Sequence, residues 1–230
     1  LRYGHLMIMT DADNDGSHIK GLILNNIQFF WPELLNLGFV VSLVTPIIKA
    51  TKGSQVVSFY TDTSYRQWYE SENRSSWKIK YYKGLGTSTS KEAQEYFKNL
   101  ANLTVGFEAD EDAERSLVLA FDKKRADHRK TWLLESTAKP REELEVAYGS
   151  INNLKVTDFI HRDFVNFSLA DLHRSIANMA DGFKPSQRKV LFTCLRKKIK
   201  NELKVAQLAA MTAEFTSYHH GEVSLADTIV

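Results

Sequence analysis

The residues best suited to chemistry lie in MIMTDADNDGSHIKG (7–21), where Asp11, Asp13 and Asp15 alternate before Gly16. Side chains alternate in an extended segment, so three carboxylates are expected to face one side while Gly16 lets the chain turn into a helix. Such carboxylates repel one another unless a cation neutralises them, and hard oxygen donors suit Mg²⁺, with Mn²⁺ or Ca²⁺ able to substitute. The N-terminus of the following helix adds a favourable place for an anion. The pattern predicts a metal site that acts on phosphate.

Three other interpretations of this motif compete. An EF-hand loop begins D-x-D-x-D-G, but its twelfth position requires a bidentate Glu and here is Leu22, and a predicted strand replaces the helix that should precede it. An aspartyl phosphatase could use Asp13 as nucleophile, although the acidic pair that such enzymes place after a later strand is not evident. The acids could also merely cap a helix, which would need only one of them. A Mg²⁺ site acting on phosphodiesters is therefore favoured.

A second junction between a predicted strand and a predicted helix has related features. The stretch WKIKYYKGLGTSTSKEA (77–93) leads into KGLG (83–86) and then into a helix with the capping-box pattern Thr89-x-x-Glu92. This arrangement places Lys83 and exposed backbone amides where a phosphate can bind. The spacing of a Walker loop is absent, and an ordinary turn at the start of a helix explains the stretch equally well when it is taken alone.

The elements that would position these residues follow from hydrophobic periodicity. Apolar or alternating runs predict strands at about 6–10, 39–50, 55–61 and 77–82, with a hairpin turn at 52–54. Amphipathic patterns predict helices at 17–31, with Ser17 as N-cap, and at about 90–100, 111–121 and 125–135. Strands and helices mixed in this way indicate an α/β domain. The stretch 136–158 has the character of a linker, and amphipathic helix predominates after it.

Composition and charge narrow the classes of protein. Of the 230 residues 43% are apolar, and the longest apolar runs are too short to cross a bilayer. The single cysteine, Cys194, excludes a disulfide framework and a cysteine-based zinc site, and fits a reducing compartment. The net charge is only +2, but acidic residues gather at 107–114 and a basic patch comprises Lys184, Arg188, Lys189, Arg196, Lys197, Lys198, Lys200 and Lys204. A polyanion would be attracted to the basic patch and repelled by the acidic run, although a charge run by itself is more often solvated surface.

Five blocks of the sequence carry a family resemblance. They are TDADNDGSHIKGL, YYKGLGTSTSKEA, AFDKKRADHRKTWL (120–133), ADGFKPSQRKVLFTC (180–194) and YHHGEVSLADTIV (218–230). In this order they closely resemble the DNA cleavage core of eukaryotic type IIA DNA topoisomerases (topoisomerase II), across essentially the whole chain. The resemblance implies an α/β fold: the C-terminal part of a Rossmann-like Toprim domain at 1–135, a linker at 136–158, and the N-terminal part of a mainly helical winged-helix domain at 159–230.

The resemblance implies ATP-dependent double-strand DNA cleavage, strand passage and religation through a tyrosyl-DNA intermediate. It implies that Mg²⁺ is held by Asp11 and Asp13, with Asp15 close to the site, and that ATP is bound by a domain absent from this chain. The nucleophilic tyrosine of the Arg-Tyr pair and the glutamate of the E-G-D-S-A motif are expected outside residues 1–230, so the fragment alone is expected to be inactive. The implied partners are double-stranded DNA and a second copy in a homodimer, with no membrane, and the implied location is the nucleus or, alternatively, the mitochondrion.

The family pattern also implies roles for residues in the second half. Arg174 matches an arginine that helps to stabilise the scissile phosphate, which a guanidinium suits well. His220 matches a histidine near the tyrosine, although the pattern does not separate it from His219. The DNA backbone contacts implied by the match are Lys184, Arg188 and Lys189.

Two considerations qualify these implied roles. Where the family usually has Ile-Pro before the Asp-Gly turn, this chain has Ile176-Ala177-Asn178, so the backbone beside Arg174 is expected to be less constrained.

The alternative function is a non-catalytic DNA-binding module that uses the Toprim scaffold. An Arg-Tyr pair downstream of these residues would favour the enzyme, and its absence the module.

Overall fold

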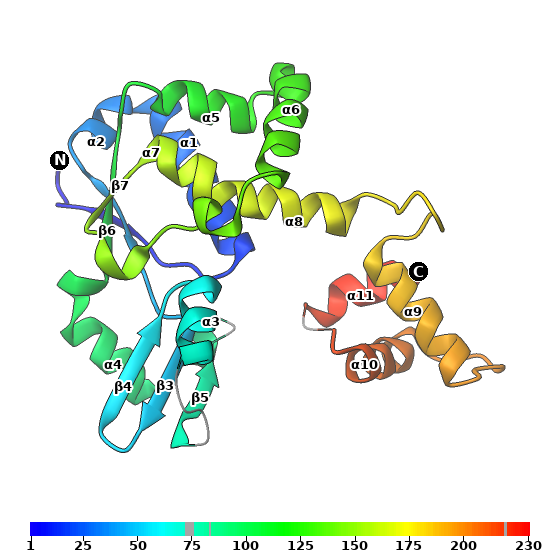
Figure 1. The fold of residues 1–230 in the computed structure, drawn as a ribbon. Coiled ribbons are helices and arrows are strands. Elements are labelled where there is room, and N and C mark those ends of the chain that lie inside the picture. The colour runs from blue at the N-terminus through cyan, green and yellow to red at the C-terminus, as the bar shows by residue number, and fades with distance from the viewer. Residues whose placement is uncertain (72–75, 83, 219) are drawn as a thin grey trace. The chain divides into compact units, whose positions relative to one another are not determined.

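The chain folds as two compact units, which Figure 1 draws as a ribbon. The computed structural model describes residues 1–71, 76–82, 84–218 and 220–230. The units comprise Leu1–Ser168 and Leu169–Val230. The first combines strands and helices, whereas the described elements of the second are helices (Figure 1). The predicted order, an α/β region followed by a mainly helical one, is confirmed.

The first unit contains a four-stranded sheet in the order β1-β2-β6-β7. Its strands are β1 (Leu6–Ile8), β2 (Val40–Leu43), β6 (Thr104–Glu108) and β7 (Asn153–Lys155). β1 runs parallel to β2 and β7 runs parallel to β6, whereas β2 and β6 are antiparallel. All four residues of β2 are buried, as expected for a strand covered on both faces.

A second sheet, β4-β3-β5, is built from β3 (Ile48–Lys52), β4 (Gln55–Phe59) and β5 (Lys78–Tyr81), and both of its pairings are antiparallel. The predicted hairpin is confirmed, with Gly53 at φ +58° in its turn. The predicted strand 39–50 is instead two strands, β2 and β3, in different sheets. Pro46 lies between them and has no backbone N–H to continue a ladder.

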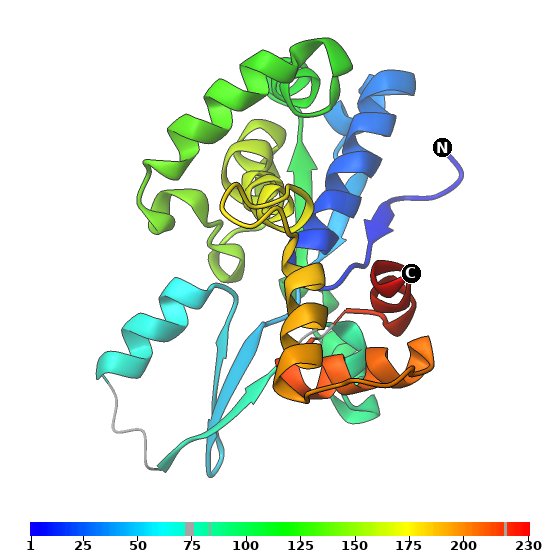
Figure 2. The same ribbon diagram turned by 90° about the vertical axis from the view of Figure 1, so that its right-hand side faces the viewer.

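Helices complete the first unit. Those of more than one turn are α1 (Asn14–Phe30), α2 (Pro32–Asn36), α3 (Asp62–Ser71), α4 (Ser90–Lys98), α5 (Ala113–Phe121), α6 (Ala126–Thr137), the π-helix η7 (Phe159–Phe164) and α8 (Val165–Ser175), which crosses the division between the units. The short ones are η2 (Leu85–Thr87), η3 (Leu100–Leu103), η4 (Lys123–Arg125), η5 (Arg141–Leu144), η6 (Tyr148–Ser150) and α7 (Val156–Asp158). In both ribbon views β3, β4 and β5 lie at the opposite end of this unit from α5 and α6 (Figures 1 and 2).

The main core lies where α1, α5 and η7 cover the first sheet. Its fully buried side chains include Leu24, Phe107, Leu117 and Phe159. The rings of Phe107 and Phe159 meet edge to face, with centroids 5.4 Å apart. Burial of these side chains fixes α1 against the sheet, and α1 begins at the aspartate segment.

The predicted linker 136–158 packs within the first unit. Leu144, Val146, Leu154 and Val156 are all buried, and β7 adds to the sheet beside β6. Their apolar side chains are removed from water, which a free linker would not achieve. The compact units divide after Ser168, so 159–168, expected in the second domain, also belong to the first unit.

The second unit packs α9 (Pro185–Arg196), α10 (Val205–Thr216) and α11 (Glu222–Ile229) around a small core that includes Ala209 and Leu225. Phe192 and Phe215 stack with centroids 5.7 Å apart. Within the described part of the chain, no helix combines the length and apolarity needed to cross a membrane.

Candidate functional site

The two glycine-containing junctions meet in the first unit. The backbone N–H of Leu85 donates to Oδ1 of Asp11 at 2.7 Å, across 74 residues of sequence. A Cβ on Gly84 would lie 2.4 Å from the carboxyl carbon of Asp11, so the backbone approaches this carboxylate as closely as only glycine permits. The segment after β1 and the segment after β5 therefore form one surface, with Asp11 at their contact.

Asp13, and not the predicted Ser17, is the N-cap of α1. Asp13 has extended backbone angles, and its Oδ1 accepts the N–H of Gly16 at 2.7 Å. A Cβ on Gly16 would lie 2.0 Å from the backbone oxygen of Asp11, so this turn closes only with glycine. Ser17 lies inside the helix and its side chain is buried. The prediction of Ser17 as N-cap was wrong.

The three aspartates do not form one three-carboxylate group. Among the described residues, no three His, Cys, Asp or Glu side chains come together as a metal-binding set. The predicted alternation fails because β1 ends at Ile8 and α1 begins at Asn14, which places Asp15 in the first helical turn. The metal-binding role of these residues stays a prediction.

The chemistry of this segment nevertheless fits a divalent cation. Asp11 and Asp13 each accept a described hydrogen bond at Oδ1, and these two bonds do not involve Oδ2 of either residue. Both residues are exposed, beside the N-terminus of a helix of 17 residues. Mg²⁺ usually takes one or two carboxylates and completes its shell with water and substrate phosphate. Thr10 Oγ1, in the same segment, is a buried oxygen without a hydrogen-bond partner among the described residues.

A charged cluster supports the segment after β5. Glu92 Oε2 accepts from Lys80 Nζ at 2.8 Å and from Thr89 N at 2.7 Å, and Tyr82 donates to its other oxygen. The capping box predicted at Thr89 and Glu92 is confirmed. Burial alone would raise the pKa of Glu92, but hydrogen bonds from Lys80, Tyr82 and Thr89 outweigh it and lower the pKa from 4.5 to about 2. The predicted phosphate contact Lys83 lies outside the described residues.

A buried polar network, not predicted from the sequence, lies one turn inside α1. Ser17 Oγ donates to Asp163 Oδ1 at 2.6 Å, Lys20 Nζ is 3.9 Å from Asp163 Oδ2, and Tyr148 donates to that same oxygen. Ser17 and Lys20 are 5% and 7% exposed. One feature of the sequence could have indicated this network: Ser17 and Lys20 lie on the buried face of an amphipathic helix, where polar groups require buried partners.

Arg174 and His220 belong to the second unit. Arg174 lies in the last turn of α8, and its Nη2 is 3.2 Å from Oδ1 of Asp171 one turn earlier. The ring of His220 meets the ring of Tyr218 at a centroid distance of 5.5 Å. His219 lies outside the described residues, so the choice between the two histidines rests on the sequence.

The predicted DNA contacts of α9 have intramolecular partners. Arg188 binds Asp181 through Nε at 2.7 Å and Nη2 at 2.8 Å, and Lys189 Nζ donates to the backbone oxygen of Thr216 at 3.1 Å. The hydrogen bonds from Arg188, followed by the N–H of Phe183, lower the pKa of Asp181 to about 2. Lys184 is the N-cap residue of α9 and is exposed. Arg188 therefore also holds the turn before α9, a role that the sequence did not indicate.

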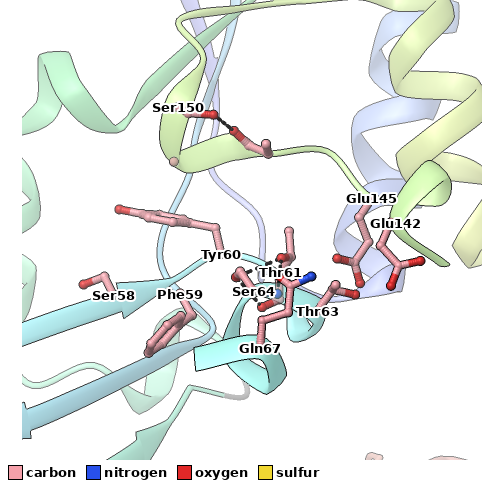
Figure 3. A pocket seen from close by; sticks show the side chains of 12 residues that line it. Ser58, Phe59, Tyr60, Thr61, Thr63, Ser64, Gln67, Glu142, Glu145 and Ser150 are labelled. Carbon is pink, nitrogen blue, oxygen red and sulfur yellow. Dashed lines mark hydrogen bonds between the residues drawn. The ribbon is translucent and has the colours of Figure 1, made fainter. Parts of the chain in front are cut away.

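A pocket of about 460 Å³ lies elsewhere in the first unit, between the start of α3 and the segment 142–150 (Figure 3). Its lining residues are Ser58, Phe59, Tyr60, Thr61, Thr63, Ser64, Gln67, Glu142, Glu145, Ala147, Gly149 and Ser150. The described lining contains two carboxylates and no Lys or Arg, and it includes none of the predicted site residues. Phosphate would be repelled there, so the pocket is not a candidate for DNA binding.

Comparison with known proteins gives two family matches. Residues 43–172 match the family described as the C-terminal associated domain of TOPRIM, and residues 174–230 match the family of the DNA gyrase/topoisomerase IV A subunits. The two matches meet close to the end of the first compact unit at Ser168.

Relatives match over the whole chain. The "Probable DNA topoisomerase 2" of Dictyostelium discoideum is 50% identical over 232 residues, and human DNA topoisomerase 2-beta is 48% identical over 239 residues; each match covers 100% of this chain and 15% of the relative. The chain thus spans about 15% of the length of these curated relatives. The solved topoisomerase II DNA-binding, cleavage and re-ligation domain of Plasmodium falciparum has a TM-score of 0.81 and 48% identity, covering 100% of this chain and 31% of that one.

Proposed function

This chain belongs to the DNA topoisomerase II family, and we propose from that premise that it is part of an ATP-dependent enzyme that cleaves and reseals duplex DNA. Its first unit would contribute Toprim carboxylates for the metal, and its second unit the beginning of a winged-helix surface for DNA. The observation that carries the proposal is the meeting of the two junctions at Asp11, in a chain whose whole length matches topoisomerase II relatives.

The carboxylates of Asp11 and Asp13 would hold Mg²⁺, for which Mn²⁺ or Ca²⁺ can substitute. When bound, the metal supplies positive charge that stabilises a leaving oxygen and anchors a neighbouring phosphate. Leu85 N–H orients the Asp11 carboxylate through its 2.7 Å bond, and the Asp13 carboxylate is oriented by Gly16 N–H. Asp15, in the first turn of α1, would add negative charge beside the site.

Residues of the second unit would act on the DNA backbone. Arg174 would stabilise charge on the scissile phosphate, and His220 would donate to that phosphate. Lys184, Arg188 and Lys189 would bind backbone phosphates without regard to base sequence. Because Asp181 already binds Arg188, a phosphate contact by Arg188 would have to share or replace that ion pair.

The whole enzyme would act as a homodimer in the nucleus or, alternatively, the mitochondrion. The nucleophilic tyrosine, the Toprim glutamate and the ATP site would come from outside residues 1–230. Double-stranded DNA is the substrate in this proposal, and passage of a second duplex through the cleaved one requires ATP.

The experiment uses the full-length enzyme with Asp11→Asn or Asp13→Asn. Asparagine is isosteric, accepts the same backbone hydrogen bond and caps a helix as well as aspartate, so each change removes charge and little else. Mg²⁺-supported cleavage of supercoiled DNA should be lost, while duplex affinity in a filter-binding assay stays within about twofold because it depends on Lys and Arg. Asp127→Asn, at an exposed position on α6, is the matched control. Normal cleavage by both variants would refute the metal assignment.

A further inference from the structure

One face of α1 packs closely against η7. Its buried residues Ser17, Lys20, Gly21 and Leu24 have the spacing of a single helical stripe. A Cβ on Gly21 would lie 2.8 Å from the ring of Phe164, so the helices approach as closely as glycine allows. Asp163 precedes Phe164 in η7 and is therefore held against the same face.

Both buried polar residues of this face bind the same carboxylate. Asp163 receives the Ser17 hydroxyl at 2.6 Å and faces the Lys20 ammonium at 3.9 Å, and it also accepts from Tyr148. Burial, followed by the charge and hydrogen bond of Asp163, raises the pKa of Tyr148 well above its usual value, so Tyr148 stays protonated and remains a donor. The Lys20 ammonium also lies 5.2 Å from the centroid of the Tyr148 ring. The network thus gives Asp163 donors or a cation from three residues.

The network connects directly to the aspartate segment. The backbone N–H of Ser17 donates to the backbone oxygen of Asp13 at 3.2 Å, and the neighbouring Gly16 N–H donates to the Asp13 carboxylate. Fixing the side chain of Ser17 therefore fixes the turn in which Asp13 is the N-cap. Asp15 lies inside that same turn.

We propose that Asp163 is a positioning residue for the metal-binding turn, acting through Ser17 on the orientation of Asp13. This inference rests on the proposed function of the Asp11 and Asp13 site, and it assigns to Asp163 a role separate from metal binding. Lys20 and Tyr148 hold the Asp163 carboxylate in place, so they contribute indirectly, through Asp163 and Ser17, to the orientation of Asp13.

A purely stabilising role does not account for this choice of residues. A buried ion pair is poor evidence of stability, because removing two charges from water offsets much of their attraction, and apolar residues of similar size often serve as well. A satisfied polar network does fix one arrangement of the elements it joins. Groups that orient metal ligands in this way typically change metal affinity by about 10-fold to 100-fold when they are removed.

The experiment compares Asp163→Asn with Asp158→Asn in the full-length enzyme. Asp158 lies in the short helix α7 just before η7, and is partly buried as Asp163 is, which makes it a matched control. Two quantities are measured: the Mg²⁺ concentration for half-maximal DNA cleavage, and the dissociation constant of Mn²⁺ determined by electron paramagnetic resonance without DNA. In Asp163→Asn one oxygen remains, and Tyr148 and Lys20 both face the position of Oδ2, so the amide NH2 turns towards Ser17, which loses its acceptor. Asp163→Asn should therefore raise both quantities by roughly 10-fold, and Asp158→Asn should leave both within about twofold.

Ser17→Ala provides the second variant, because it removes one hydrogen bond and keeps the helix. It should raise the Mn²⁺ dissociation constant in the same direction, and the double variant with Asp163→Asn should show no additional increase, since both act through one bond. If Asp163→Asn fails to fold, Ser17→Ala decides the question alone. Unchanged Mn²⁺ binding in folded Ser17→Ala would overturn the proposal. Wild-type enzyme that lacks metal-dependent cleavage would instead refute the proposed function.

Discussion

Gly84→Ala should separate folding from metal binding, because the group that its Cβ would meet first is the Asp11 carboxylate. The added carbon would lie 2.4 Å from Asp11 Cγ and 2.5 Å from each carboxylate oxygen. Carbon atoms pack at about 3.5–4.0 Å, so the carboxylate must retreat by about 1 Å. It then loses the hydrogen bond from Leu85 and the orientation that this bond gives it.

The expected cost in stability is small. Losing one exposed hydrogen bond costs about 1 kcal/mol. Gly84 has φ −176° and ψ −175°, an extended backbone that alanine also adopts, so the reduced entropy of the unfolded chain returns about 0.4–1 kcal/mol. The free energy of unfolding in urea should change by less than about 1 kcal/mol. The Mg²⁺ concentration for half-maximal cleavage should rise by roughly 10-fold or more, as for the loss of a properly placed ligand.

Gly86→Ala is the matched control for this experiment. It lies two residues away, has no heavy atom within 4 Å of its added Cβ, and does not have a positive φ. Its Mg²⁺ dependence should equal that of the wild type. The reasoning is refuted if folded Gly84→Ala cleaves DNA with an unchanged Mg²⁺ dependence, or if Gly86→Ala impairs cleavage to the same extent.

Two further predictions concern charge. Because the folded pKa of Glu92 is about 2 and lies below its ordinary 4.5, Glu92 should contribute stability above pH 4.5 that is lost as the pH falls towards 2. Discounted for the partial exposure of Lys80, this contribution is about 1–2 kcal/mol. In urea unfolding, Glu92→Gln should be destabilised by that amount at pH 6 and should be as stable as the wild type at pH 2. An equal loss of stability at both pH values would contradict the low pKa of Glu92. Neutralising Lys184, Arg188 and Lys189 together should weaken binding of unrelated duplexes alike and lower the slope of log affinity against log salt by roughly 0.9 for each phosphate that is no longer bound. Neutralising Lys123, Lys124 and Arg125 of η4 is the control, and an unchanged slope in the first triple variant would mean that its three residues bind no phosphate.

Features set by neighbours in sequence could be predicted. The capping box depends on Thr89 and Glu92, three residues apart, and the hairpin depends on Gly53 between two alternating runs. The aspartate and glycine-loop motifs could likewise be recognised as two candidate phosphate sites. Each of these signals is contained in one short segment, so none of them requires knowledge of how the rest of the chain folds.

Pairing between distant segments could not be predicted in the same way. β7 is three residues long with one buried side chain, Leu154, and it is a strand because β6 offers an edge for pairing. The packing of the predicted linker could not be predicted for the same reason, because Leu144 and Val146 are buried by segments that are distant in sequence. Short apolar patterns are ambiguous until a partner surface exists.

The sequence by itself determined that acidic residues and a glycine follow the first strand, that a second glycine loop exists, and that the family is that of topoisomerase II. The tertiary structure decided how these residues are used. Ser17 could have capped α1, but its hydroxyl is bound by Asp163, 146 residues away, and Asp13 caps the helix instead. Asp11 is oriented by Leu85 across 74 residues. Hydrogen bonds require partners within about 3 Å, and folding alone determines which distant groups come that close.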